Sequence, residues 1–199
     1  KLAAGQRYHL AQVALGDMYT TGTGVERDYG EAVRLYQLAA NQGNAFGQYN
    51  LGMMYAKGTG VKKDRIVTAH FWQLAVSQGH VEAQYGLGLM YEEGIGVKKD
   101  AVEAARLYKL AADQRYMDAQ YALGTLYKYG MGVKKDEKKA AHLYLLAVNQ
   151  GHAKAQYNLG EMYENGIGVK KDEKEAVWLY QLAADQKNPG LISFCLSRG

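Results

Sequence analysis

Apolar side chains recur along this chain with the spacing of amphipathic helices. In residues 80–92 four of them lie at i, i+4, i+7 and i+8, which places them on one face of an α-helix. They are Ala83, Leu87, Met90 and Tyr91. A glycine-containing loop follows, and then a second stripe with the same spacing, made of Ala104, Tyr108, Ala111 and Ala112. The pattern predicts a unit of helix, loop, helix and tight turn.

This unit repeats with a fixed period. Its first helix carries a Leu-Gly pair, and the glycine of that pair recurs every 36 residues, at Gly16, Gly52, Gly88, Gly124 and Gly160. A period of this size is typical of stacked supersecondary units, in which each unit contacts only its neighbours. We therefore expect an all-α protein, a right-handed α/α solenoid of about five helix-loop-helix repeats.

The loops predict how each helix ends and begins. Gly94 and Gly96 supply the backbone freedom for a left-handed helix end and a change of direction. Asp100 is placed to cap the second helix, and Glu103 would complete a capping box. The cap aspartate recurs as Asp28, Asp64, Asp136 and Asp172.

The mid-helix glycine costs about 1 kcal/mol relative to alanine, so it needs a structural reason. We expect it to let the second helix approach closely. The predicted contact is the small residue on that helix, which is Ala32, Thr68, Ala104, Ala140 or Ala176.

The motif of the third unit resembles the Sel1-like repeat of the tetratricopeptide-like solenoids. It consists of Ala83, Leu87-Gly88, Tyr91, Gly94, Gly96-Val97, Asp100, Ala104 and Ala111-Ala112. The resemblance covers residues 1–187, with two departures: Val13 replaces the first tyrosine of unit one, and Arg115-Tyr116 replaces Gly-His. Residues 1–4 match residues 37–40, so the chain is expected to begin within a repeat of a longer protein. Residues 188–199 are expected to form a short capping helix or a degenerate sixth repeat.

The resemblance implies a scaffold or adaptor that binds a peptide or protein in its concave groove, without catalysis of its own. It also suggests a bacterial periplasmic or secreted protein, with the cytoplasm left open. Two alternatives remain: a structural spacer within a larger envelope protein, and an enzyme acting on cell-wall or lactam substrates. The relatives linked to the second activity are cysteine-rich, and this chain has only Cys195.

A tyrosine two residues before each leucine forms the candidate binding surface. We call Tyr49, Tyr85, Tyr121 and Tyr157 the tyrosine ladder. In the third unit the ladder shares a helix face with Leu89, Glu92 and Glu93. The corresponding candidates in the other units are Met53, Lys57, Thr125, Lys128, Tyr129 and Glu161. Tyrosine suits a protein contact because it offers a large area and few rotamers. The alternative is that the rings pack between successive hairpins.

Lysine pairs precede most of the capping aspartates, at Lys62-Lys63, Lys98-Lys99, Lys134-Lys135 and Lys170-Lys171. They would line one edge of the array and could meet an acidic protein or lipid headgroups, or simply stay solvated. We expect no nucleic-acid partner, because the net charge is only +4 and no aromatic residues stand between the lysines to stack bases.

The sequence predicts no metal site, no catalytic triad and no membrane span. His70, His80, His142 and His152 have no cysteine near them and lack metal-ligand spacing, so we expect structural or surface histidines and no metal or cofactor. No nucleophilic triad stands out. No apolar run approaches 18 residues, so no transmembrane segment is expected.

Overall fold

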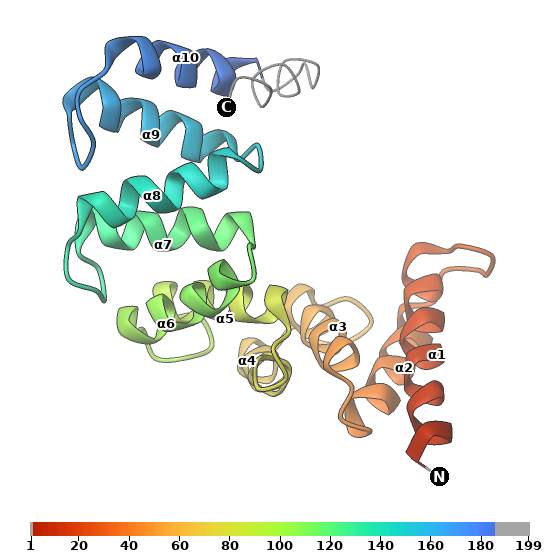
Figure 1. Cartoon of the computed structure of the whole chain (residues 1–199). Helices are drawn as coiled ribbons and strands as arrows, with labels where there is room; N and C mark the ends of the chain where they lie inside the picture. The colour runs from red at the N-terminus through yellow and green to blue at the C-terminus, as the bar shows by residue number, and fades with distance from the viewer. Residues whose placement is uncertain (1, 186–199) are drawn as a thin grey trace. The chain divides into compact units, whose positions relative to one another are not determined.

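The computed structural model describes residues 2–185, with side chains from residue 8 onward. This part of the chain contains ten α-helices joined by turns and loops (Figure 1). In order they are α1 (Leu2–Thr21), α2 (Tyr29–Asn41), α3 (Ala45–Lys57), α4 (Arg65–Val76), α5 (Val81–Glu93), α6 (Ala101–Asp113), α7 (Met117–Tyr129), α8 (Glu137–Val148), α9 (Ala153–Asn165) and α10 (Glu173–Ala184). The predicted all-α class is confirmed.

The chain forms two compact units, residues 1–100 with α1–α5 and residues 101–199 with α6–α10. Within each unit, every helix packs against the helix that follows it in the chain. Odd-numbered helices are the first helices of the predicted repeats, and even-numbered helices are the second. The core of each unit consists of alanine, leucine and aromatic side chains between these helices, such as Leu51 and Tyr36 in the first unit and Leu159 and Tyr144 in the second.

Glycine ends the first helices as the sequence predicts. Gly58, Gly94, Gly130 and Gly166 have φ between 68° and 74°, and each N–H donates to a carbonyl four residues earlier. A side chain is strained at such φ values, which explains the choice of glycine. The second glycine of each loop also has a positive φ, and at Gly60 an added Cβ would lie 2.5 Å from the carbonyl oxygen of Tyr29. The loop of one repeat therefore packs on the start of the second helix of the preceding repeat.

The aspartate caps are confirmed at four of the five predicted positions, but the capping box is not. Asp28 accepts a hydrogen bond from the Glu31 backbone N–H, and Asp64, Asp136 and Asp172 cap their helices in the same way. The Glu31 carboxylate, however, binds Arg34 at 2.6 and 2.8 Å instead of reaching back to the cap. The Asp28 backbone N–H already donates to the Tyr19 carbonyl, so the cap offers no free donor. Glu103 likewise pairs with Arg106.

The contact of the mid-helix glycine differs from the prediction. In four repeats the atoms nearest to an added Cβ belong to an aromatic ring on the second helix, and not to the small residue that we expected. The pairs are Gly16 with Tyr36, Gly52 with Trp72, Gly124 with Tyr144 and Gly160 with Tyr180. The small residue contributes only a backbone carbonyl, from Ala140 and Ala176, at 3.4 Å. The glycine thus makes room for a flat aromatic ring of the second helix.

Of residues 1–4, which the sequence predicts to end a preceding repeat, those from Leu2 onward belong to α1, and no turn separates them from the first repeat. Arg7 stands at the position that Gly43, Gly79 and Gly151 occupy in three other turns, each with φ between 81° and 85°. The predicted cap at residues 188–199, and Cys195 with it, lies outside the described residues.

Candidate partner-binding face

The tyrosine ladder lies on the first helices, with Tyr49 on α3, Tyr85 on α5, Tyr121 on α7 and Tyr157 on α9. The first three side chains are half-buried, and Tyr157 is 56% exposed. No ladder ring is fully buried, so each keeps surface that a partner could touch.

Neighbouring aromatic rings hold the ladder rings in place. Tyr49 stacks on His80 at 4.5 Å between ring centroids and on Trp72 at 5.9 Å. Tyr121 stacks on His152 at 4.6 Å, with a tilted contact to Tyr144 at 5.8 Å. Burial raises the pKa of Tyr49, and the charge of Glu82 adds to the effect. Tyr49 and Tyr121 therefore pack between successive hairpins, as the alternative interpretation expects, and still contribute half-exposed rings to the surface.

Side chains around the ladder differ from repeat to repeat. On α3 Met53 is half-buried and Lys57 is exposed. On α5 Leu89 and Glu93 are exposed, and Glu92 is half-buried.

On α7 Tyr129 is 61% exposed, whereas Thr125 and Lys128 are half-buried, as is Glu161 on α9. The fixed ladder is thus surrounded by apolar, acidic, basic and hydroxyl groups that vary along the chain.

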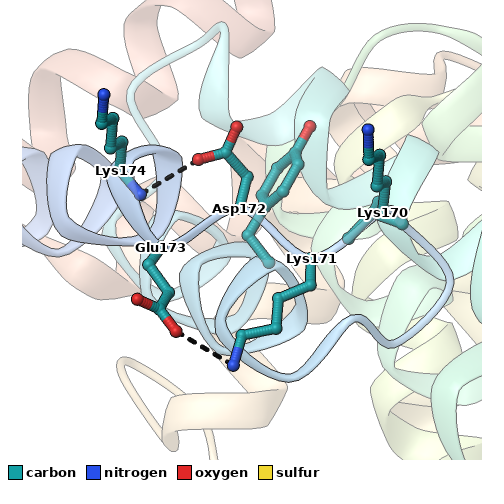
Figure 2. A pocket seen from close by; sticks show the side chains of 7 residues that line it. Lys170, Lys171, Asp172, Glu173 and Lys174 are labelled. Atoms are coloured by element: carbon teal, nitrogen blue, oxygen red, sulfur yellow. Dashed lines mark hydrogen bonds and ion pairs between the residues drawn. The ribbon is translucent and has the colours of Figure 1, made fainter.

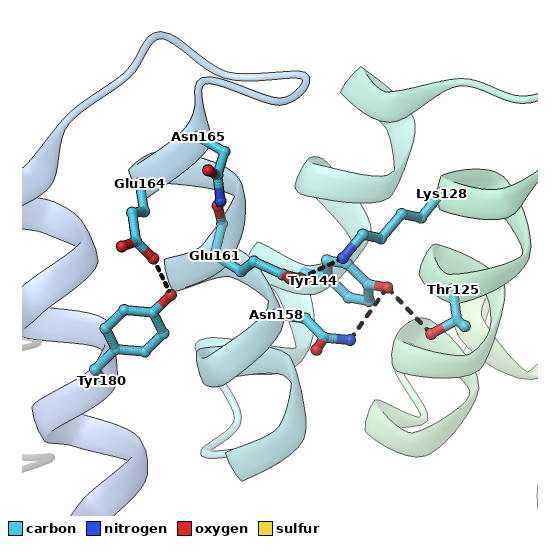
Figure 3. A network of polar contacts seen from close by, with 8 residues as sticks. All are labelled: Thr125, Lys128, Tyr144, Asn158, Glu161, Glu164, Asn165 and Tyr180. Atoms are coloured by element: carbon cyan, nitrogen blue, oxygen red, sulfur yellow. Dashed lines mark hydrogen bonds and ion pairs between the residues drawn. The ribbon is translucent and has the colours of Figure 1, made fainter.

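A polar network joins this face to the helix beneath it in the second unit (Figure 3). The Tyr144 hydroxyl on α8 lies 3.1 Å from the Thr125 hydroxyl, and the Asn158 amide donates to it at 3.3 Å. Further along the chain, the Tyr180 hydroxyl donates to Glu164 at 2.7 Å. These bonds fix polar groups of adjacent helices relative to one another.

Lys128 is not a freely solvated cation. Its Nζ lies 2.5 Å from the Glu161 carboxylate in the next repeat, and its side chain is only 10% exposed. Burial alone would lower the pKa of Lys128, but the hydrogen bond to Glu161 and its negative charge outweigh burial and raise it. Two positions that the sequence presents as separate candidates therefore form one ion pair between neighbouring repeats.

The first unit carries a related arrangement that sequence reasoning missed. The Tyr36 hydroxyl donates to Asp17 at 2.6 Å, and the Asn50 amide donates to the same oxygen at 3.1 Å. Burial and the hydrogen bond to Asp17 raise the pKa of Tyr36. Asn50 and Asn158 each follow a ladder tyrosine directly, and this shared position was the available signal.

The lysine pairs are exposed on the loops. In the last loop Lys171 pairs with Glu173 at 3.0 Å, while Lys170 and Lys174 point to the other side (Figure 2). Together with Tyr163 and the cap residue Asp172 they line an open surface hollow. Asp172 accepts hydrogen bonds from the backbone N–H groups of Lys174 and Glu175, so its carboxylate serves the helix terminus.

Two of the histidines have a structural role. His80 Nδ1 accepts a hydrogen bond from the Ala83 backbone N–H at 3.4 Å, and His152 Nδ1 accepts one from Ala155 at 3.1 Å. Each side chain thereby caps a first helix. Among residues 8–185 no group of three histidine, cysteine, aspartate or glutamate side chains is placed to hold a metal ion. Within the described helices, none has the length and apolar character needed to cross a bilayer.

A comparison with protein families agrees with the repeat spacing, the glycine-ended first helices and the aspartate-capped second helices. The Sel1 repeat model matches five times, at residues 9–44, 45–80, 81–116, 118–152 and 153–188. The chain belongs to the Sel1 repeat family. No curated protein matches it.

Solved Sel1 repeat structures share the fold. The protein is similar to c5321, described as a protective antigen of uropathogenic Escherichia coli with an SLR fold, with 38% identity and a TM-score of 0.88 over 94% of this chain. This chain spans only 40% of the length of that protein. It is also similar to a Sel1 repeat protein from Oxalobacter formigenes, with 34% identity and a TM-score of 0.86, covering 92% of this chain and 75% of the other. An immunity protein, Pa5087 from Pseudomonas aeruginosa, is 27% identical with a TM-score of 0.55, covering 89% and 68%.

Proposed function

We propose that this Sel1 repeat protein is an interaction scaffold that binds a peptide or protein segment along the tyrosine-ladder face of its first helices. The observation that carries the proposal is the state of the ladder rings. Tyr49 and Tyr121 are held by stacked neighbours yet remain half-exposed. A ring that is already ordered loses little conformational entropy when a partner covers it.

The surroundings of the ladder support selective binding. Leu89 and Tyr129 offer exposed apolar area in two different repeats. Lys57 on α3 and Glu93 on α5 offer opposite charges. Within one unit, an extended segment lying across the first helices would meet two ladder tyrosines, each with different neighbours beside it, so the ladder supplies affinity and the neighbours supply specificity.

The test begins with peptides selected against this chain from a random display library. The double variant Tyr121→Ala/Tyr157→Ala removes two ladder rings. We expect its affinity for the selected peptides to fall roughly tenfold or more, as for truncation of aromatic contacts at other interfaces. Fluorescence polarisation with labelled peptide measures the loss, and circular dichroism verifies that helicity is retained.

The matched control removes two exposed tyrosines away from the ladder. Tyr8→Ala/Tyr29→Ala makes the same chemical change at side chains that are 68% and 37% exposed. We expect this control to bind within about twofold of the unchanged chain, as is usual for surface substitutions. Selection of no peptide, or equal loss in both double variants, would favour a spacer without a binding face.

A further inference from the structure

The loops between first and second helices carry exposed apolar side chains beside the lysines. We define the basic loop edge of the second unit by Val102, Met131, Lys134, Lys138, Lys170 and Lys174. Val102 is 66% exposed and Met131 is 38% exposed. All four lysines are exposed as well. Apolar and cationic groups are thus both accessible on this part of the surface.

The backbone brings these residues to one edge. A Cβ added at Gly132 would meet the carbonyl of Ala101 and the backbone nitrogen of Val102, so the loop that bears Met131 lies against the start of α6. A Cβ added at Gly168 would meet the carbonyl of Glu137, so the next loop lies against the start of α8, beside Lys138. Neighbouring loops therefore form a continuous edge within the unit.

The edge has an excess of positive charge. Residues 134–139 and 170–174 contain seven lysines and four carboxylates. Lys135 and Lys171 are partly neutralised by Glu137 and Glu173. Asp136 and Asp172 cap helices, and the Asp136 carboxylate also lies 3.5 Å from Lys139 Nζ. Lys134 and Lys170 have no carboxylate within ion-pairing distance among the described residues.

The first unit has a similar edge of its own. Ile66 at the start of α4 is 72% exposed, and Ile95 in the following loop is 43% exposed. A Cβ added at Gly96 would meet the Arg65 carbonyl, so this loop also lies against the start of a second helix. Lys62 and Lys98 are exposed on the two loops. The combination of apolar and basic groups therefore occurs independently in both units.

We propose that the basic loop edge docks on an anionic lipid bilayer surface. The lysines would lie over lipid phosphates, and Val102 and Met131 would enter the boundary between headgroups and acyl chains. A protein partner fits less well, because lysine is depleted from protein interfaces. This surface is distinct from the tyrosine-ladder face, and its function does not depend on peptide binding.

Cosedimentation with lipid vesicles tests the proposal on the whole chain. We expect binding to phosphatidylcholine vesicles that contain phosphatidylglycerol, and little binding to phosphatidylcholine alone. Raising salt from about 0.05 M to about 0.5 M should release most of the protein, since screening weakens the attraction of lysines to phosphates. Equal binding to neutral vesicles, or none to anionic vesicles, would overturn the proposal.

Two pairs of variants separate this edge from general charge and hydrophobicity. Lys134→Gln/Lys170→Gln should weaken binding to anionic vesicles about tenfold or more at low salt. The matched control Lys109→Gln/Lys154→Gln removes two lysines from helices α6 and α9 and should bind nearly as well as the unchanged chain. Val102→Ser/Met131→Ser should also weaken binding.

The control for the apolar pair is Leu145→Ser/Val177→Ser, at side chains that are 42% and 54% exposed on α8 and α10. It should leave vesicle binding unchanged. Equal loss in a variant and its control would contradict docking through this edge. Capture of soluble polyglutamate without vesicle binding would assign the edge to an acidic polypeptide and overturn the lipid assignment.

Discussion

At the scale of single residues, the mid-helix glycine and a buried aromatic ring act as a pair. Tyr144 is fully buried, and its Cδ1 and Cε1 atoms would lie 2.9 Å from a Cβ at Gly124. The second repeat uses Trp72 in the same place, and its larger ring also covers Gly86, where an added Cβ would lie 2.7 Å from Cζ3. The lack of a side chain at Gly86 therefore leaves room for the Trp72 ring.

The substitution Gly124→Ala tests this pairing. Alanine should favour the helix by about 1 kcal/mol, but the buried Tyr144 ring cannot move away from the new methyl group, and such overpacking typically costs about 1–3 kcal/mol. We therefore expect a lower melting temperature in thermal unfolding followed by circular dichroism. Gly30→Ala is the control, because its closest neighbour is the exposed Asp28 carboxylate at 3.3 Å. A melting temperature lowered as much by Gly30→Ala would contradict the pairing.

The two histidine caps should make the free energy of unfolding depend on pH. Burial lowers the pKa of His80 and of His152 below the ordinary 6.5, although Glu82 and Asp118 partly oppose the shift. The unfolded chain then binds protons more readily than the folded one, so the free energy of unfolding should fall as pH drops below about 6.5. Urea unfolding at about pH 7.5 and about pH 5.5 measures this loss.

A double variant identifies the groups responsible. His80→Asn/His152→Asn keeps a cap, because Asn44 already caps α3 by accepting from the Gly47 N–H at 2.8 Å. Asparagine does not titrate, so the difference in unfolding free energy between the two pH values should shrink. An unchanged difference would place the titrating groups elsewhere.

At the scale of helices and loops, the second glycine of four loops packs on the preceding repeat. Gly60→Ala should destabilise the chain for two reasons: φ is +70° at this position, and the new Cβ would lie 2.5 Å from the Tyr29 carbonyl oxygen. Gly79→Ala shares the first reason only, since φ is +82° but no atom lies within 4 Å. The cost of Gly79→Ala should be about 1–2 kcal/mol, and that of Gly60→Ala clearly larger. Equal losses in urea unfolding would show that loop packing contributes nothing.

At the scale of the whole chain, fold and site were predictable to different degrees. The glycines recur with a fixed period, and an aspartate cap such as Asp28 depends only on neighbouring residues. The sequence alone therefore predicts helices, loops and repeats. The partner of Gly124 depends on how two helices pack, which no local pattern specifies. The Lys128–Glu161 pair links positions 33 residues apart, and its strength depends on burial that the sequence does not show.

The candidate site was found only in outline for the same reason. The ladder tyrosines were visible from their period, but their stacking on His80 and His152 was not. Asn50 and Asn158 were missed because the other repeats have different residues at their position. Whether such residues bind a partner depends on chemistry outside this chain, which a periodic sequence does not encode.

The central claim, that the first helices present the partner-binding face, is tested most directly by hydrogen–deuterium exchange with a peptide selected against the chain. We predict slower exchange in the first helices of the unit that holds the peptide, α3 and α5 in the first unit or α7 and α9 in the second, because a covered surface opens less often. Exchange in α4 and α8 should remain unchanged. Protection confined to α4 and α8, with the first helices unaffected, would contradict the claim.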